Sequence, residues 1–189
     1  MPTTGARVRV GLLRRDEIPF LASLWNTREV MRYADEFPRE RGWNRKWEPE
    51  AAWDEYRKRR ARLGFEYSQL ILRSPDGTPL GESFFAPLPD GYEFGAWQKP
   101  KKKRTVMGDL KLLPEFWGRG IGTEAMRKVV RWVFLRTPCD LFIVPPHRRN
   151  PAAQRVYEKA GFVLHPATEP ARRHRVMELT RRVFDRDLR

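Results

Sequence analysis

The spacing of apolar and polar residues divides the first third of the chain into one strand and three helices. Basic and apolar residues alternate over 7–13 (RVRVGLL), which predicts an opening strand. Helical spacing follows over 18–25, with Asp16 as the expected cap, and a second short helix is predicted over 28–34. Residues 48–64 begin with acidic side chains, end with basic ones and close on a glycine, so they predict a third helix.

Strand and helix patterns alternate through the rest of the chain. Strands are predicted over 66–73, 81–88, 105–113, 140–144, 162–164 and 175–180. The first two enclose the turn sequence PDGTP and form a predicted hairpin. Helices are predicted over 123–136 and over 151–160, where Asn150 is the cap and Gly161 stands just past the end. The remaining segments are predicted to be irregular: 37–47, 89–104 and a solvated end over 181–189.

The composition is that of one soluble domain over residues 1–189. Hydrophobic residues make up 40% of the chain, enough for a core, and the formal net charge of +14 implies attraction to polyanions. Cys139 is the single cysteine, so no disulfide can form within the chain, and its spacing to the histidines predicts no metal site. With no evident signal peptide and no apolar run near the roughly 20 residues that span a bilayer, we expect a cytoplasmic protein without membrane contact.

A glycine-rich loop is the first sign of chemistry. The sequence WGRGIG joins the predicted strand 105–113 to the helix after it, and its three glycines allow a tight turn and close approach of a ligand. The following helix directs free N–H groups and its positive dipole end at the loop, which together favour phosphate. A turn of small residues with no ligand is the alternative. The loop lacks the Gly-Lys-Ser/Thr of a P-loop and the spacing of a dinucleotide fingerprint.

A second motif, PHRRNPAAQRVYEKAGF over 146–162, follows the next predicted strand. Together with GRGIG, its pattern N-x-x-A-x-x-x-Y-E-K-A-G-F resembles the GNAT superfamily of N-acetyltransferases. Within it, the resemblance is to aminoglycoside 6′-N-acetyltransferases and ribosomal-protein N-terminal acetyltransferases, and it is most specific over residues 105–164. Trp117 departs from the superfamily pattern, which has Gln or Arg at that place.

The resemblance implies an α/β (α+β) fold: a single GNAT-like domain with a mixed central sheet splayed between two parallel strands and flanked by helices. It implies that acetyl-CoA, the co-substrate, lies in the splayed cleft and pairs its pantetheine arm with the backbone of Leu112 and Leu113. Asn150 and Tyr157 match cofactor-contacting residues of the family. The loop residues expected to bind the cofactor are Trp117, Gly118, Arg119, Gly120, Ile121, Gly122 and Thr123.

Transfer to an amine requires a base and an acid. An amine of pKa near 10.4 must lose a proton before it attacks the thioester, and the departing thiolate must gain one. We expect Asp109 as the base, near the aspartate of the aminoglycoside enzymes, with Glu82 and Glu93 as further carboxylates. Tyr157 is the expected acid. The alternatives are an ion-paired strand-end carboxylate for Asp109, a core aromatic for Tyr157 and a plain helix cap for Asn150.

Two functions follow: an N-acetyltransferase acting on a primary amine, or a non-catalytic GNAT-like binder of acidic partners or nucleic acid. The glycines, Asn150 and Tyr157 favour the enzyme, and we expect a monomer or homodimer that does not bind nucleic acid. The acceptor, a small molecule or a peptide, is not specified. Lys99–Arg104 (KPKKKR) predicts weak activity on polycationic aminoglycosides if it borders the acceptor cleft. The tryptophans expected on the acceptor side are Trp43, Trp47 and Trp53.

Overall fold

The computed structural model describes residues 7–34, 43, 48–167 and 173–189; Trp47 and most of the predicted 37–47 loop lie outside them. The strands are β1 (Arg9–Leu12), β2 (Ser68–Arg73), β3 (Pro79–Pro87), β4 (Glu93–Phe94), β5 (Trp97–Gln98), β6 (Thr105–Leu112), β7 (Leu141–Val144), β8 (Val163–Leu164) and β9 (Met177–Thr180). Within the described residues, they form a seven-stranded mixed sheet in the order β1-β2-β3-β6-β7-β9-β8 and a separate β4-β5 pair.

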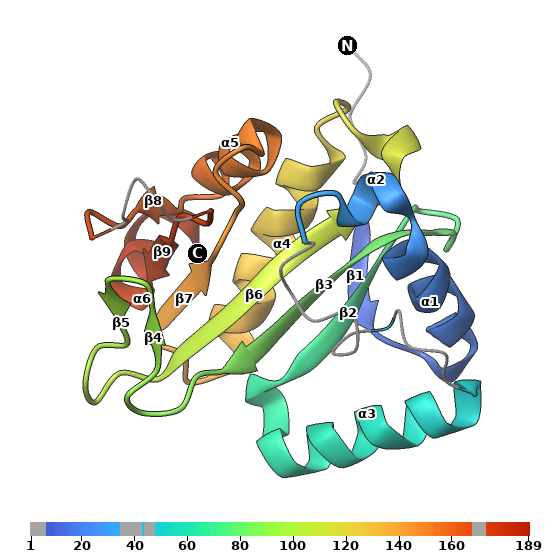
Figure 1. Cartoon of the computed structure of the whole chain (residues 1–189), viewed down its shortest axis with the longest axis horizontal. Helices are drawn as coiled ribbons and strands as arrows, with labels where there is room; N and C mark the ends of the chain where they lie inside the picture. Colours follow the sequence, from blue (N-terminus) through green and yellow to red (C-terminus); the bar gives the residue numbers. More distant parts are fainter. Residues whose placement is uncertain (1–6, 35–42, 44–47, 168–172) are drawn as a thin grey trace.

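Helices cover both faces of the main sheet (Figure 1). The α-helices are α1 (Ile18–Asn26), α2 (Arg28–Met31), α3 (Pro49–Leu63), α4 (Ile121–Arg136), α5 (Pro151–Lys159) and α6 (Arg181–Val183). The short 3-10 segments are η1 (Arg15–Glu17), η2 (Gly64–Glu66) and η3 (Pro114–Phe116), and a π-helical turn, η4 (Phe184–Leu188), ends the chain described. In Figure 1, α4 crosses one face of the sheet, and α1 and α3 lie on the other.

Strand alternation divides the core between these two faces. On β2, Leu70 and Leu72 join the cluster beneath α4, whereas Ile71 joins a second cluster under α1 and α3. The apolar face predicted for α4 from helical spacing is buried, which confirms that prediction. The order of strands and helices predicted after residue 65 is also confirmed.

The sheet opens between its two parallel strands. The pairing of β6 with β7 begins at Thr105 and Leu141 and ends at Met107 and Ile143. On its other side β6 stays paired with β3 as far as Leu112. The last part of β6 therefore has β3 on one side and no paired strand on the side of β7, which confirms the predicted splayed mixed sheet.

The segment 89–104 is more ordered than predicted. It contains the β4–β5 hairpin, whose Trp97 is 1% exposed and packs with Leu88, Leu141 and Ile143. The hairpin therefore covers the face of β7 opposite α4. A strand of two residues is too short to show the alternation of apolar and polar side chains by which a strand is predicted from sequence.

Two further expectations are wrong. Asp16 does not cap α1, because η1 extends the helix by one turn and Glu17 becomes its N-cap residue. The expected solvated end is wrong for Phe184, which is fully buried and stacks on Phe134 with ring centroids 4.9 Å apart, although five of the nine residues over 181–189 are exposed. The Arg181 guanidinium fixes this segment by donating to three carbonyl oxygens, those of Phe134 at 2.9 Å, Thr137 at 2.8 Å and Cys139 at 2.8 Å.

Candidate active site

The glycine-rich loop leads directly into α4. Gly118 has φ 73° and Gly120 has φ 75°, so both adopt the left-handed conformation that glycine permits. Gly120 is the N-cap residue of α4, and a helix of this length presents unpaired amides and a positive dipole end at its first turn. Thr123 lies in that first turn, half-buried. The loop thus has the backbone geometry of an anion site.

Gly122 packs against β6 and α5 at the start of α4. A Cβ atom at Gly122 would lie 3.4 Å from side-chain atoms of both Leu112 and Val156. The start of α4 is therefore held tightly against β6 and α5. Ile121 beside it is 8% exposed and joins the core, so its backbone rather than its side chain faces the loop.

Backbone groups before the loop already have partners in the chain. The Leu113 amide donates to the Leu80 carbonyl at 3.0 Å, and the Trp117 amide donates to the Pro114 carbonyl at 3.0 Å. The indole of Trp117 donates to the Leu112 carbonyl at 2.8 Å. The cofactor contacts predicted for Leu112, Leu113 and Trp117 therefore compete with hydrogen bonds inside the protein. A Cβ atom added at Gly118, by contrast, would have no atom of the described residues within 4 Å.

Arg7 is a neighbour of the loop that the sequence did not reveal. Its guanidinium donates to the Arg119 carbonyl at 2.6 Å and lies 3.1 Å from the position of a Cβ atom at Gly120. Glu124 on α4 accepts from the Arg7 amide at 3.0 Å and from its Nε at 3.3 Å. The residues before β1 thus support the loop from more than a hundred positions away, a distance over which no local pattern could signal the contact.

Asn150 is the cap of α5, as predicted. Its Oδ1 accepts from the Ala153 amide at 3.1 Å, and Pro151 occupies the first turn. The helix ends before Gly161, which has φ 100°. The cap is confirmed, and a cofactor contact by Asn150 stays a prediction.

Tyr157 and Asp109 lie near the point where β6 and β7 separate. Asp109 stands two residues beyond Met107, the last β6 residue paired with β7. Tyr157, on α5, is 4% exposed and packs edge-on against Phe162. Burial raises the pKa of Tyr157 further above its ordinary value, the negative charge of Asp109 adds to the rise, and a hydrogen bond with the Leu110 backbone opposes it. Tyr157 is therefore protonated at neutral pH, with its hydroxyl beside the strand that carries Asp109.

A buried charged cluster surrounds Asp109. Glu82 pairs with Lys111 across β3 and β6, and Phe84 pairs with Asp109, so strand alternation places Glu82, Asp109 and Lys111 in one part of the sheet. Lys111 Nζ contacts Asp109 Oδ2 and lies 3.1 Å from Glu82 Oε1. The indole of Trp25, on α1, donates to Glu82 Oε1 at 2.8 Å, which places the cluster on the face covered by α1.

The two carboxylates of this cluster differ in how many of their oxygens have hydrogen-bond partners. Glu82 is fully buried, and its Oε2 accepts from the Gln69 side chain. Asp109 has a side chain 32% exposed, yet its Oδ1 is buried and has no hydrogen-bond partner among the described residues. Burial raises the pKa of Asp109 to about 6; Lys111 opposes the rise and Glu82 adds to it. Asp109 is therefore ionised at neutral pH and holds one oxygen ready to accept a proton.

Of the other residues expected near the acceptor, Trp43 lies beside the charged cluster, whereas Trp53 and Glu93 lie elsewhere. The Trp43 indole donates to Gln69 Oε1 at 3.1 Å, so Trp43 belongs to the hydrogen-bond network around Glu82. Trp53 packs against Tyr56 of α3, with ring centroids 5.5 Å apart, and contributes to the core there. Glu93 lies on the β4–β5 hairpin and accepts from Gln98 at 3.0 Å, apart from the cluster.

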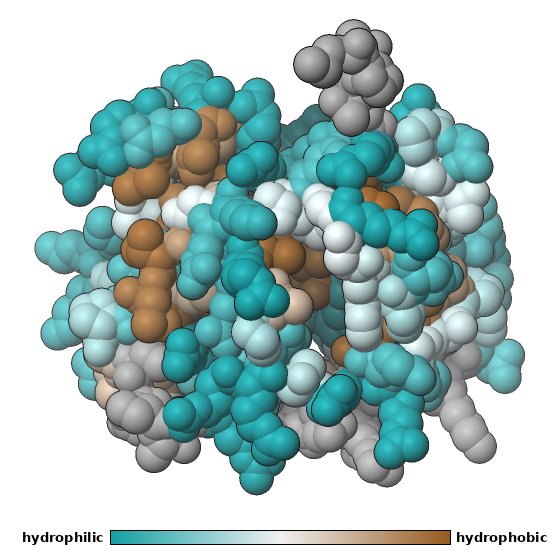
Figure 2. All heavy atoms as spheres, turned by 90° about the horizontal axis from the view of Figure 1, so that it is seen from above, coloured by the Kyte–Doolittle hydropathy of each residue, from teal (hydrophilic) through white to brown (hydrophobic). Residues whose placement is uncertain are grey.

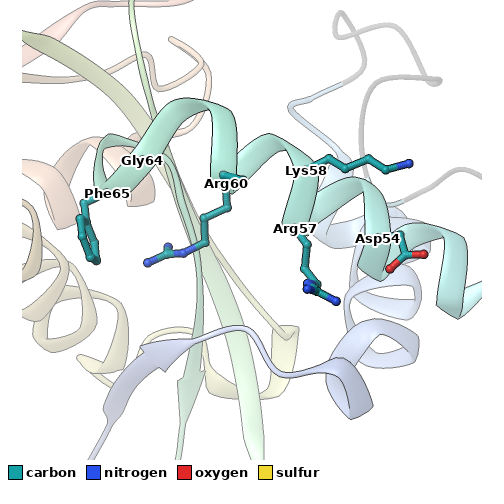
Figure 3. Close-up of a pocket in the computed structure, with 7 residues that line it drawn as sticks. Asp54, Arg57, Lys58, Arg60, Gly64 and Phe65 are labelled. Carbon is teal, nitrogen blue, oxygen red and sulfur yellow. The ribbon is translucent and has the colours of Figure 1, made fainter.

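The end of the sheet at which β6 and β7 separate is hollowed. Figure 2 looks down on that end and shows apolar surface recessed between hydrophilic surface on either side. A different groove, of about 660 Å³, lies along α3 (Figure 3). Its lining residues are Asp54, Arg57, Lys58, Arg60, Ala61, Gly64 and Phe65. None of the predicted site residues is among them, so this basic groove is not where the predicted chemistry would occur.

Metal-binding groups and helices able to span a membrane are both absent from the described residues. No group of three or more His, Cys, Asp or Glu side chains suited to a metal ion occurs within the part of the chain that the structure describes. In the same residues, no helix is long and apolar enough to cross a membrane. Cys139 is buried, and burial raises the pKa of its thiol to about 12, so the thiol is unreactive at neutral pH.

Comparison with known proteins identifies the class. The splayed parallel pair and the glycine-rich turn before α4 are suited to a phosphate-bearing ligand. Residues 7–163 match the family model described as "Acetyltransferase (GNAT) domain". The match covers most of the chain, which therefore belongs to the GNAT acetyltransferase family and is an acetyl-CoA-dependent N-acetyltransferase of amines.

Solved structures share the fold at low sequence identity. Aminoglycoside acetyltransferase AAC(6′)-Ib in complex with coenzyme A is 20% identical with a TM-score of 0.68, over 95% of this chain and 98% of that chain. The same enzyme with ribostamycin and coenzyme A gives a TM-score of 0.70 at 20% identity, over 96% and 97% of the two chains. Spermidine N-acetyltransferase from Vibrio cholerae in complex with CoA and spermine is 16% identical with a TM-score of 0.68, over 94% and 98%.

These findings decide between the two functions left open by the sequence. The family is that of an enzyme, so the non-catalytic binder is set aside.

The basic segment Lys99–Arg104 precedes β6, and Lys101, Lys102 and Lys103 are exposed. Asp109 lies four residues into β6, about 13 Å along the strand from its start. The segment is thus removed from the cluster that would meet the acceptor.

Proposed function

We propose that this protein acetylates a primary amine whose nitrogen binds to the carboxylate of Asp109. Acetyl-CoA would lie between β6 and β7, with its phosphates on the loop from Gly118 to Thr123. The observation that carries the proposal is the buried, unpartnered Oδ1 of Asp109 beside the point where the strands part. An unpaired buried acceptor is costly, so it calls for a donor that the described residues do not supply. The N–H of an acceptor amine is such a donor.

Asp109 would act as the base. The amine would reach Oδ1 from the α1 side, lose its proton to the carboxylate, and attack the carbonyl carbon of the thioester. A pKa of about 6 suits this task, because the group is ionised at neutral pH yet basic enough to accept a proton. A carboxylate with an ordinary pKa near 3.9 would be a weaker base.

Tyr157 would act as the acid. When the tetrahedral intermediate collapses, the carbon–sulfur bond breaks and the sulfur gains a proton from the Tyr157 hydroxyl, so that CoA leaves as a thiol. The raised pKa of Tyr157 keeps this proton in place at neutral and moderately alkaline pH. The products are the N-acetylated amine and CoA. The nitrogen releases its second proton and Asp109 releases the proton it accepted, while the tyrosinate recovers one proton from solvent.

The acceptor amine would belong to a small molecule or to a peptide. Two of the solved structures that share the fold are acetyltransferases, one bound to an aminoglycoside and the other to spermine, which supports an amine acceptor. The network from Trp43 through Gln69 and Glu82 to Lys111 would form the wall of the acceptor site.

The proposal is tested in two stages. First, acetyl-CoA should raise the melting temperature at both low and high salt, because a specific site stabilises by mass action whereas attraction of a basic protein to any polyanion fades with salt. Second, a panel of amines, peptides and aminoglycosides is screened for release of free CoA. Binding without transfer to any of them, with the cofactor shown to be intact, would contradict the proposal.

A further inference from the structure

Lys111 holds a fixed positive charge inside the site. Its side chain is 8% exposed, its ammonium contacts Asp109, and it lies 3.1 Å from Glu82 Oε1. It also lies 4.3 Å from the ring centroid of Trp25, within the range of a cation–π interaction. Burial favours the neutral amine, but the two carboxylates outweigh it and raise the pKa of Lys111. Lys111 is therefore a permanent ammonium that its surroundings prevent from turning out to solvent.

This ammonium and its neighbours use all but one of the cluster's carboxylate oxygens. Glu82 Oε1 accepts from Trp25 and Lys111, and Glu82 Oε2 accepts from Gln69. Asp109 Oδ2 contacts Lys111, and Asp109 Oδ1 alone is left. Two carboxylates and one ammonium carry a formal charge of −1, so one arriving ammonium makes the cluster neutral.

We propose that Lys111 is a specificity-determining residue, which restricts the acceptor to primary amines with no second positive charge close to the reacting nitrogen. This inference rests on the proposed function, in which Asp109 receives the amine. A second cationic group on the acceptor would find no free carboxylate oxygen in the cluster. It would instead approach the Lys111 ammonium, where burial weakens the screening of like charges. Monoamines and peptide amines flanked by neutral or acidic groups fit the site, and polycations do not.

The test compares two acceptors of equal length, butylamine and the diamine putrescine, in the wild type and in Lys111→Met. We expect the wild type to prefer butylamine by kcat/KM. Removing the ammonium should shift the ratio toward putrescine by about tenfold or more, chiefly through the KM of the diamine. The matched control is Lys103→Met, which removes the same charge from the exposed segment and should leave the ratio unchanged.

A second variant covers the case in which Lys111→Met does not fold, because it leaves two buried carboxylates uncompensated. Lys111→Gln keeps a donor between them and should produce the same shift. A wild type that prefers putrescine, or a ratio unchanged in a folded Lys111 variant, would overturn the specificity role. Failure of the proposed function looks different: no amine of the wider panel is acetylated, or the rate is the same in Asp109→Asn.

Discussion

The ammonium of Lys111 contacts Asp109, two residues earlier on the same strand, while the other oxygen of that carboxylate has no hydrogen-bond partner in the part of the chain that the structure describes. Strand alternation brings the two side chains to one face of β6. The pair sits just past the last residues of β6 and β7 that are hydrogen-bonded to each other. A carboxylate held on one side and open on the other, next to an opened sheet, is suited to bind an amine and take its proton.

Asp109→Asn should remove the basic group and with it the rise of kcat/KM near pH 6. The base form of Asp109 grows as pH rises through about 6, so the wild-type kcat/KM should rise across that pH and then level off. In the variant, only acceptor that is already neutral can react, and the rate loss should be on the order of 10²-fold near pH 7 and shrink toward pH 10. Initial rates of CoA release from pH 5 to pH 10 provide the measurement.

The control for this variant is Asp90→Asn. Asp90 is also paired with a lysine, Lys99, but its side chain is 93% exposed and remote from the cluster. It should keep the wild-type profile. A loss in Asp109→Asn that is equal at every pH would assign Asp109 to positioning the acceptor rather than to proton transfer.

Tyr157→Phe should slow transfer and leave the affinity for acetyl-CoA nearly intact. The substitution keeps the ring in its contact with Phe162 and removes the hydroxyl group that would donate the proton. Loss of a general acid costs on the order of 10² to 10⁴ in rate. Single-turnover kinetics isolates the chemical step, with Tyr92→Phe as the control at a half-buried tyrosine on the approach to β4. A parental single-turnover rate in Tyr157→Phe would exclude the residue from the mechanism.

Gly120→Val should abolish tight binding of acetyl-CoA. The residue has φ 75°, and a side chain there would meet the Arg7 guanidinium, with the Cβ atom 3.1 Å from it. Both effects displace the loop that would bind the phosphates. Calorimetric titration with acetyl-CoA is the measurement, and Gly91→Val is the matched control, because Gly91 also has φ 75° but nothing lies within 4 Å of its added Cβ. Equal affinities in the two variants would refute the loop assignment.

Glu82→Gln should destabilise the fold. An amide in place of the carboxylate turns one acceptor oxygen into a donor facing Trp25, Gln69 or Lys111, and it removes one anion from a buried ion pair. We expect a cost of about 3 kcal/mol, or a fall in melting temperature of roughly 6–12 °C. Thermal unfolding followed by circular dichroism measures it, and the exposed Glu93→Gln should unfold like the parent. An unchanged melting temperature in Glu82→Gln would mean that the network contributes little to stability.

The main elements could be predicted because each carries its own local pattern. Helical spacing identified α4, and Asn150, Pro151 and Gly161 marked both ends of α5 within one short stretch. The end of the chain was misjudged because its four arginines and two aspartates obscure Phe184, whose burial depends on packing against Phe134 of α4. Charge pattern alone cannot reveal such a contact between distant segments.

The site was predicted in part for the same reason. Tyr157 stands in the motif N-x-x-A-x-x-x-Y-E-K-A-G-F, and Asp109 was expected from its place on the strand before the glycine-rich loop. Their proximity follows from the splayed sheet. Lys111 could have been found by strand alternation, since it lies two residues from Asp109 on one face. Trp25 and Gln69 could not, because they come from α1 and β2 and their approach to Glu82 depends on how these elements pack.

The most direct measurement of the account is transfer of isotope-labelled acetyl from acetyl-CoA to a panel of primary amines, followed by mass spectrometry of both products. The account predicts a labelled N-acetyl amide and an equal amount of free CoA with the wild type, and a strongly reduced yield with Asp109→Asn in the same time. Hydrolysis of acetyl-CoA to labelled acetate, with no labelled amide from any amine of the panel, would contradict it.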